Sequence, residues 1–158
     1  MHYTNFTADL PSAASNSTYC ISSLFSSNSN STYKDLIPFQ TIPVNVKNTG
    51  SVSSDYVILG FLYGTFGPMP YPQKSLVAYT RLHNVTAGSS QIGNLSLTLG
   101  SLARANDEGD MVLYPGDYSL VIDTDAKAIW NFTLTGDATT LDSWPAPPPF
   151  GNPGNGTM

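Results

Sequence analysis

Positively charged residues are scarce in this chain of 158 residues. It carries six Lys and Arg against eleven Asp and Glu, for a formal net charge of −5, and charged residues make up only 11% of the sequence. The six basic residues are scattered rather than gathered into a stripe. Nucleic-acid binding depends on clustered Lys and Arg that neutralise phosphates. The sequence therefore argues against a nucleic-acid partner, and equally against an anionic membrane surface.

Cysteine and long apolar runs are also rare. Cys20 is the single cysteine, so a disulfide or redox pair within the chain has no second thiol, and Cys20 is either free or paired outside this sequence. No apolar run approaches the roughly 20 residues of a membrane-spanning helix. The first residues also lack the basic start and apolar core of a signal peptide.

Asn-X-Ser/Thr sequons are abundant by contrast. They lie at Asn5, Asn16, Asn30, Asn84, Asn94, Asn131 and Asn155. A chain of this composition would carry about three by chance. Although the high Ser and Thr content inflates the number, the excess favours an N-glycosylated protein that is secreted and extracellular. Because no export signal is present, we expect the natural N-terminus to lie upstream of Met1.

No constellation of side chains predicts catalysis. A glycosidase needs two carboxyl groups about 5 to 9.5 Å apart, but most acidic residues here lie in expected turns. The densest cluster, Asp107, Glu108 and Asp110, is either a weak cation site or a solvated hairpin turn, and a spacing that does not fit an EF-hand loop favours the turn. His2 and His83 stand apart, and no Gly-X-Ser-X-Gly or His-Glu-X-X-His motif is present. We expect no catalytic residue, no metal and no cofactor.

Composition divides the chain into three regions. Residues 1–37 are predicted to be a linker, since nine of the 20 residues from 12 to 31 are serine. Residues 138–158, with their run of proline and glycine, are predicted to be an extended or disordered tail. Between them, residues 38–137 have the usual size of an immunoglobulin-like sandwich.

Apolar alternation and turn residues predict an all-β fold for this middle region. The seven strands are expected at residues 41–48, 55–63, 75–83, 91–99, 111–114, 117–123 and 127–135. In the fourth strand Leu95, Leu97 and Leu99 share one face, which places Asn94 on the other. In the last strand Trp130, Phe132 and Leu134 point inward, so Asn131 points outward. Two sequons therefore fall on solvent-facing positions, as a bulky glycan requires.

The second strand is apolar on both faces, although a two-layer sandwich covers only one. The outer face consists either of Tyr56, Ile58 and Leu62 or of the alternate set. This face packs on another domain or is covered by nearby loops, and the sequence leaves both alternatives open.

Aromatic residues in loop 64–72 are the candidates for contact with sugar. Three prolines stiffen this loop and are able to hold an aromatic ring outward. Phe66 and Tyr71 are therefore the candidate substrate-binding residues. The competing interpretation, that the loop packs on a neighbouring domain or on its own strand ends, is favoured. Trp130 alternates with core residues and is expected to be buried.

Short segments resemble the fibronectin type III-like domain that closes family 3 glycoside hydrolases, and in particular the fungal exo-1,4-β-xylosidases. The domain resemblance rests on residues 42–52, 72–81 and 114–118, and the xylosidase resemblance on residues 2–6, 54–57, 97–104 and 130–134. The resemblance runs from about residue 2 to residue 145. Relatives often have a cysteine before a Pro-Phe pair, where this chain has Ile37 before Pro38 and Phe39, which puts a linker disulfide to Cys20 in doubt.

The resemblance implies a fibronectin type III-like β-sandwich of about seven strands with irregular N- and C-terminal extensions. It implies a non-catalytic accessory domain of a xylan-degrading β-xylosidase, whose catalytic carboxylates belong to the preceding domains and match no position here. The expected partners are those catalytic domains, with xylan or xylo-oligosaccharide at the domain edge. The alternative is a free-standing secreted polysaccharide-binding module.

Overall fold

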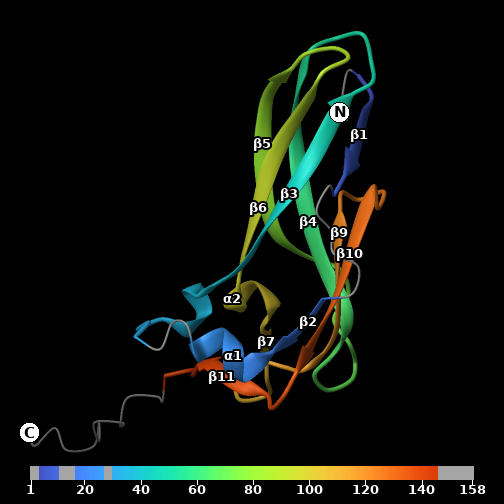
Figure 1. Cartoon of the computed structure of the whole chain (residues 1–158). Helices are drawn as coiled ribbons and strands as arrows, with labels where there is room; N and C mark the ends of the chain where they lie inside the picture. Colours follow the sequence, from blue (N-terminus) through green and yellow to red (C-terminus); the bar gives the residue numbers. More distant parts are fainter. Residues whose placement is uncertain (1–3, 11–16, 27–29, 146–158) are drawn as a thin grey trace, which may run out of the picture.

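Two twisted β-sheets pack face to face and enclose the hydrophobic core (Figure 1). The structure is a computed structural model and describes residues 4–10, 17–26 and 30–145. The first sheet has the strand order β1 (Phe6–Asp9), β3 (Pro38–Asn48), β6 (Ser90–Thr98). The second has the order β2 (Ser17–Cys20), β10 (Ala128–Thr135), β9 (Gly116–Ile122), β4 (Ser54–Phe66), β5 (Ser75–Val85). A small third sheet has the order β11 (Thr139–Asp142), β8 (Met111–Leu113), β7 (Arg104–Ala105).

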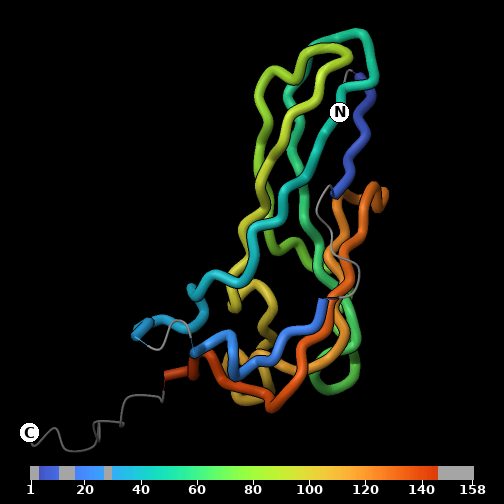
Figure 2. The backbone as a smooth tube through the Cα atoms, viewed as in Figure 1, coloured from blue at the N-terminus to red at the C-terminus, as the bar shows by residue number. Residues whose placement is uncertain are grey.

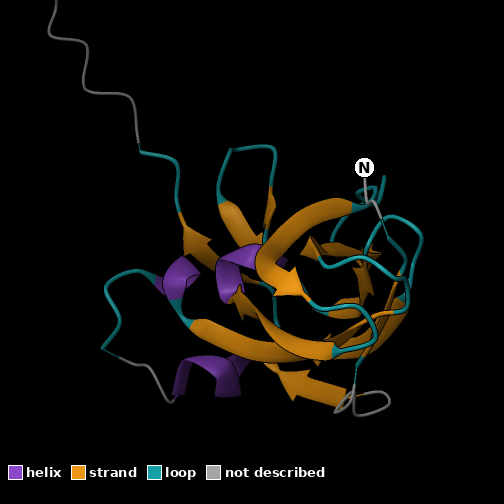
Figure 3. Ribbon diagram, turned by 90° about the horizontal axis from the view of Figure 1, so that it is seen from above, coloured by secondary structure: helices purple, strands orange, loops and turns teal. Residues whose placement is uncertain are grey.

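Short helices gather on one side of the strands (Figure 3). They are α1 (Ile21–Ser26), the 3-10 helix η1 (Lys34–Leu36) and α2 (Leu99–Leu102). The side chain of Thr98 caps α2 by accepting a hydrogen bond from the backbone N–H of Ser101 at 3.3 Å. No helix within the described residues is long and apolar enough to cross a membrane.

The predicted all-β sandwich is confirmed, and each of the seven expected strands is present. The predicted register is also confirmed. Leu95, Leu97 and Leu99 are at most 1% exposed. Trp130, Phe132 and Leu134 are likewise buried, while Asn94 and Asn131 are exposed. The strict alternation of apolar residues determines the register of these strands, because a shift of one residue would move each buried set to the solvent side.

A stack of aromatic rings forms the lower part of the core. The Phe66 ring lies 4.0 Å from that of Tyr118, which lies 5.2 Å from Phe132, and Phe132 lies 4.5 Å from Trp130. The hydroxyl of Tyr118 donates to the carbonyl oxygen of Tyr114 at 2.6 Å. This bond resembles the tyrosine corner of immunoglobulin-like sandwiches. Burial of Tyr118 raises its pKa, so the hydroxyl keeps its proton and remains a donor.

The N-terminal segment is not the irregular linker that its composition predicted. β1 pairs antiparallel with β3, with Phe6 opposite Asn48, and β2 pairs parallel with β10. Figure 2 shows this segment running beside first one sheet and then the other. Phe6, Ala8 and Ile21 are buried in the core. Strand pairing uses backbone groups, so a Ser-rich segment with a few well-placed apolar side chains can join a sheet.

Asn48 connects the N-terminal segment to the turns at the upper end of the sandwich. Its side chain is fully buried. The amide nitrogen donates to the carbonyl oxygens of Val52 at 2.8 Å and Val85 at 2.9 Å. The amide oxygen accepts from the Thr4 hydroxyl and the Gly50 N–H, both at 3.0 Å. With these bonds a polar group is buried without loss of hydrogen bonding.

The expected C-terminal tail is also ordered at its start. β11 pairs antiparallel with β8, and Leu141 is buried at 7% exposed. The expectation of irregular chain is therefore wrong for residues 139–142, because one apolar side chain and a free edge on β8 suffice for pairing. Residues 146–158 lie outside the described residues. The domain boundaries at 37 and 137 stay predictions.

Candidate functional site

The loop between β4 and β5 lies at the end of the molecule opposite the turn between β3 and β4 (Figure 1). β4 continues three residues beyond the predicted end at residue 63 and stops at Phe66. The Phe66 ring is only 3% exposed, since it heads the aromatic stack. Phe66 is therefore not an outward substrate-binding ring, and that prediction is corrected. Within the loop, Met69 is 77% and Tyr71 42% exposed. Tyr71 thus keeps the accessible position that a sugar-binding ring needs.

Arg104 holds this loop in place. Its guanidinium donates to three backbone carbonyl oxygens, those of Phe66 at 2.6 Å, Pro68 at 3.0 Å and Pro70 at 3.2 Å. The planar fork of Arg presents several donors in fixed directions, which suits three carbonyls on one turn. This role could not be predicted from the sequence, because Arg104 lies 34 to 38 residues away from its partners.

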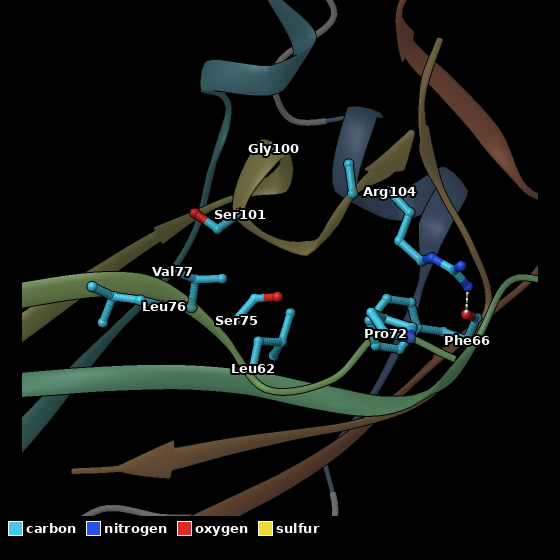
Figure 4. A pocket seen from close by; sticks show the side chains of 10 residues that line it. Leu62, Phe66, Pro72, Ser75, Leu76, Val77, Gly100, Ser101 and Arg104 are labelled. Atoms are coloured by element: carbon cyan, nitrogen blue, oxygen red, sulfur yellow. Dashed lines mark hydrogen bonds between the residues drawn. The ribbon is translucent and has the colours of Figure 1, made fainter. Parts of the chain in front are cut away.

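A cavity of about 430 Å³ opens between the base of this loop and α2 (Figure 4). It is lined by Leu62, Phe66, Pro72, Ser75, Leu76, Val77, Gly100, Ser101, Ala103 and Arg104. Of these lining residues only Arg104 is ionisable. The cavity therefore lacks the pair of carboxyl groups that glycoside hydrolysis requires.

A second groove, of about 390 Å³, lies between the loop and the turn of residues 106–110. The loop contributes Met69 and Pro70, and the turn contributes Asn106, Asp107 and Glu108. The turn is held by Asn106, whose side-chain oxygen accepts the backbone N–H of Glu108 at 3.0 Å and of Asp110 at 2.8 Å. Among the residues that the structure describes, no three His, Cys, Asp or Glu side chains gather closely enough to hold a metal ion.

The outer face of β4 carries the alternate apolar set that the sequence left open. Tyr56, Ile58 and Leu62 point into the core, whereas Val57, Leu59 and Phe61 are half-buried on the outside. Across the register, Leu59 lies opposite Tyr79 and Phe61 opposite Leu76 of β5. Exposure is 39% for Tyr63, 52% for Leu76 and 74% for Tyr79. We call Val57, Leu59, Phe61, Tyr63, Leu76 and Tyr79 the outer apolar patch. Contiguous exposed apolar surface of this kind is typical of an interaction site.

The sequons are accessible wherever the structure describes them. Asn5, Asn30, Asn84, Asn94 and Asn131 are all exposed. Asn16 and Asn155 lie outside the described residues. Cys20 is an exposed free thiol within the described part of the chain. The thiol lies 3.1 Å from the Ser22 hydroxyl, and hydrogen bonds from Ser22 lower the pKa of Cys20.

His83 lies on the surface next to a carboxylate. Asp55 accepts the backbone N–H of Asn84 at 2.8 Å, the guanidinium of Arg81 at 2.8 Å and is 3.3 Å from His83 Nδ1. The Asn84 N–H first, and then Arg81, lower the pKa of Asp55. All three side chains belong to β4 and β5 and are exposed or half-buried, so the cluster ties two strand ends together.

Comparison with known proteins shows which proteins this chain is similar to. No protein-family model matches the chain. It is 42% identical over 151 residues to a probable exo-1,4-β-xylosidase of Aspergillus fumigatus and 40% identical over 151 residues to one of Neosartorya fischeri. Each match covers 94% of this chain and 20% of the relative. The chain is homologous to one region of the exo-1,4-β-xylosidases.

Solved structures agree with this assignment. A GH3 exo-β-xylosidase in complex with a xylobiose aziridine probe matches with a TM-score of 0.85 and 31% identity. That match covers 91% of this chain and 19% of the solved one. β-Glucosidase 3B of Thermotoga neapolitana shares the fold, with a TM-score of 0.63 at 18% identity. The chain thus spans about a fifth of the xylosidases it matches, which is consistent with a C-terminal domain of a GH3 xylosidase.

Proposed function

We propose that this chain is a non-catalytic accessory domain of a secreted, N-glycosylated GH3 β-xylosidase that acts in xylan breakdown. The observation that carries the proposal is the homology over 94% of this chain to only 20% of the xylosidases, which leaves four-fifths of their length to other domains. In this proposal the catalytic carboxylates belong to those other domains, and this domain stabilises or borders them.

The positions of the acidic residues support a non-catalytic role. The cavity in Figure 4 has no carboxylate. Asp55, Asp123 and Asp125 bond to Arg81, Tyr56 and Lys127, and these contacts hold strands and turns. Retaining and inverting glycosidases need two carboxyl groups on either side of a scissile bond. Carboxylates engaged in local structural bonds are poorly suited to that task.

The outer apolar patch is our proposed contact with the catalytic domains. It crosses two neighbouring strands, and the half-buried Leu59 and Phe61 form a base from which the exposed Tyr79 projects. In the same arrangement, loop 64–72 borders the substrate entrance. Arg104 fixes the loop, and Tyr71 is its accessible ring.

The reading frame upstream of Met1 tests the proposal most directly. We expect an in-frame catalytic region; a stop codon and signal peptide there would instead favour the free-standing polysaccharide-binding module. The purified chain should release no nitrophenol from an aryl xyloside, and any release that survives further purification would contradict the non-catalytic assignment.

A pair of tyrosine variants tests the contact. In the complete parent enzyme, Tyr79→Ser should lower the thermal midpoint of unfolding. In this chain alone it should leave the midpoint unchanged, because Tyr79 is 74% exposed. Tyr33→Ser, at a 65% exposed tyrosine outside the patch, is the control. Equal effects of both variants in the parent would argue against docking on the patch.

A further inference from the structure

Trp144 is an exposed indole held in a defined position. It is 71% exposed, whereas Trp130, the other tryptophan, is 5% exposed. The backbone N–H of Trp144 donates to the side chain of Asp110 at 2.8 Å. Asp110 is itself fixed by its own backbone N–H, which donates to the Asn106 side chain. The position of Trp144 is therefore set by its contact with the 106–110 turn as well as by the segment that follows β11.

The glycine under the ring makes this position possible. Gly109 has a φ of +86°, and a Cβ there would lie 3.4 Å from Trp144 Cβ, 3.5 Å from Cγ and 3.6 Å from Cδ2. The indole thus rests against the turn with no side chain between them. The left-handed backbone favours glycine at this point. Most of the ring surface remains in solvent.

The turn that the Trp144 ring packs against also carries polar side chains. The same turn supplies Asn106, Asp107 and Glu108 to the groove that faces Met69 and Pro70 of the loop. A pyranose ring has an apolar face of C–H groups, which packs on an aromatic ring, and a rim of hydroxyls, which needs hydrogen-bond partners. A binding site for a small polar ligand combines apolar surface with a few such polar groups. The 106–110 turn brings both together.

We propose that Trp144 and the groove along the 106–110 turn bind a β-1,4-linked pyranose chain. Trp144 stacks on one sugar ring, and Asn106, Asp107 and Glu108 accept or donate hydrogen bonds to hydroxyls of the same chain. The choice of xylan as this chain rests on the proposed function, because the homologous enzymes are xylosidases. A single exposed aromatic residue is common on protein surfaces. Trp144 differs in being anchored by Asp110, which belongs to the same turn as the groove residues Asn106, Asp107 and Glu108.

The buried Trp130 serves as an internal control for the exposed Trp144 in a binding experiment. We would label the whole chain with ¹⁵N and follow both indole Nε1–H signals during titration with xylohexaose. The Trp144 signal should move and the Trp130 signal should stay. Trp144→Ala should weaken binding at least tenfold. Asp110→Ala keeps the ring but removes its anchor, and should weaken binding several-fold. Tyr33→Ala, which removes an exposed ring elsewhere, should bind like the unmodified chain.

Two results would overturn the proposal. One is a Trp144 signal that does not move at about 10 mM xylohexaose, a concentration that detects even millimolar dissociation constants. The other is an unchanged affinity in Trp144→Ala. The accessory role is tested separately, by the upstream reading frame and by hydrolysis of aryl xyloside, so a failure here leaves that role intact.

Discussion

The guanidinium of Arg104 lies 2.6 Å from the carbonyl oxygen of Phe66, across the opening of the loop between β4 and β5. The same group reaches the carbonyls of Pro68 and Pro70 and lies 5.9 Å from the Phe66 ring centroid. One side chain thus satisfies backbone acceptors in a loop whose prolines have no N–H to donate. The loop owes its fixed shape to a residue from the following part of the chain.

Arg104→Ala should destabilise the protein by about 1 to 3 kcal/mol, because it removes the donor of the partly buried carbonyl of Phe66 and of two exposed carbonyls in the same loop. Urea unfolding followed by fluorescence measures the change. Arg81→Ala is the matched control: Arg81 is 59% exposed, and loss of its surface ion pair with Asp55 should cost at most about 1 kcal/mol. Similar losses in the two variants would argue against the special role of Arg104.

Ile21→Ala tests whether the N-terminal segment is part of the folded domain. Ile21 is 1% exposed, and truncation of a buried Ile typically costs about 2 to 5 kcal/mol. The identical substitution at Ile92, which is 61% exposed, should change the free energy of unfolding by less than about 0.5 kcal/mol. Thermal unfolding of both variants measures the difference. A loose linker would make the two variants equally stable.

Asn48→Ala should be among the most harmful polar substitutions. It removes a side chain that donates to two carbonyls and accepts two further hydrogen bonds in a fully buried site. A cost of about 2 to 4 kcal/mol is expected, because four hydrogen bonds of a fully buried side chain are lost at once, one of them to the buried Val85. Asn45→Ala, which removes only an exposed bond to Asp9, is the control in the same strand. Chemical denaturation with both variants gives the comparison.

The Asp55 cluster should make a small pH-dependent contribution to stability. The pKa of Asp55 in the folded chain is below the ordinary value of 3.8, first because of the hydrogen bond from the Asn84 N–H and then because of Arg81. A lowered carboxyl pKa stabilises the folded state above the unfolded value, and this contribution is lost as pH falls through the folded value. Carboxyl NMR should therefore give a midpoint for Asp55 below 3.8, and Arg81→Ala should raise it. A titration midpoint of Asp55 that is the same in Arg81→Ala as in the unmodified chain would contradict this account.

Most of the sandwich could be predicted from the sequence because its strands alternate. In β6 and β10 the apolar residues occupy every second position, so both the strands and their buried faces were evident. β1, β2 and β11 were missed because each is four residues long and relies on pairing with a distant strand. For β2 the partner strand lies more than a hundred residues away, since Ser17 is opposite Phe132, and composition alone cannot reveal such a pairing.

The candidate site was predicted less well. Phe66 was assigned to the loop, yet it continues the parity of Tyr56, Ile58 and Leu62, all buried, and that alternation was a usable signal. The anchoring of Trp144 had no such signal. It depends on Asp110 and Gly109, which reach it only through the pairing of β11 with β8. Side-chain partners set by tertiary pairing are not encoded in local periodicity.

The parallel pairing of β2 with β10 sets the order in which this protein can fold during synthesis. Thr135 donates to the carbonyl oxygen of Tyr19, 116 residues earlier in the chain. The ribosome must therefore complete nearly the whole domain before β2 has a partner, at about 5 to 20 residues per second. Asn30 lies between β2 and β3, so it emerges long before that edge can close. In the proposed glycoprotein, a glycosylating enzyme would therefore reach Asn30 before β2 is paired, and the finished sandwich would carry that glycan.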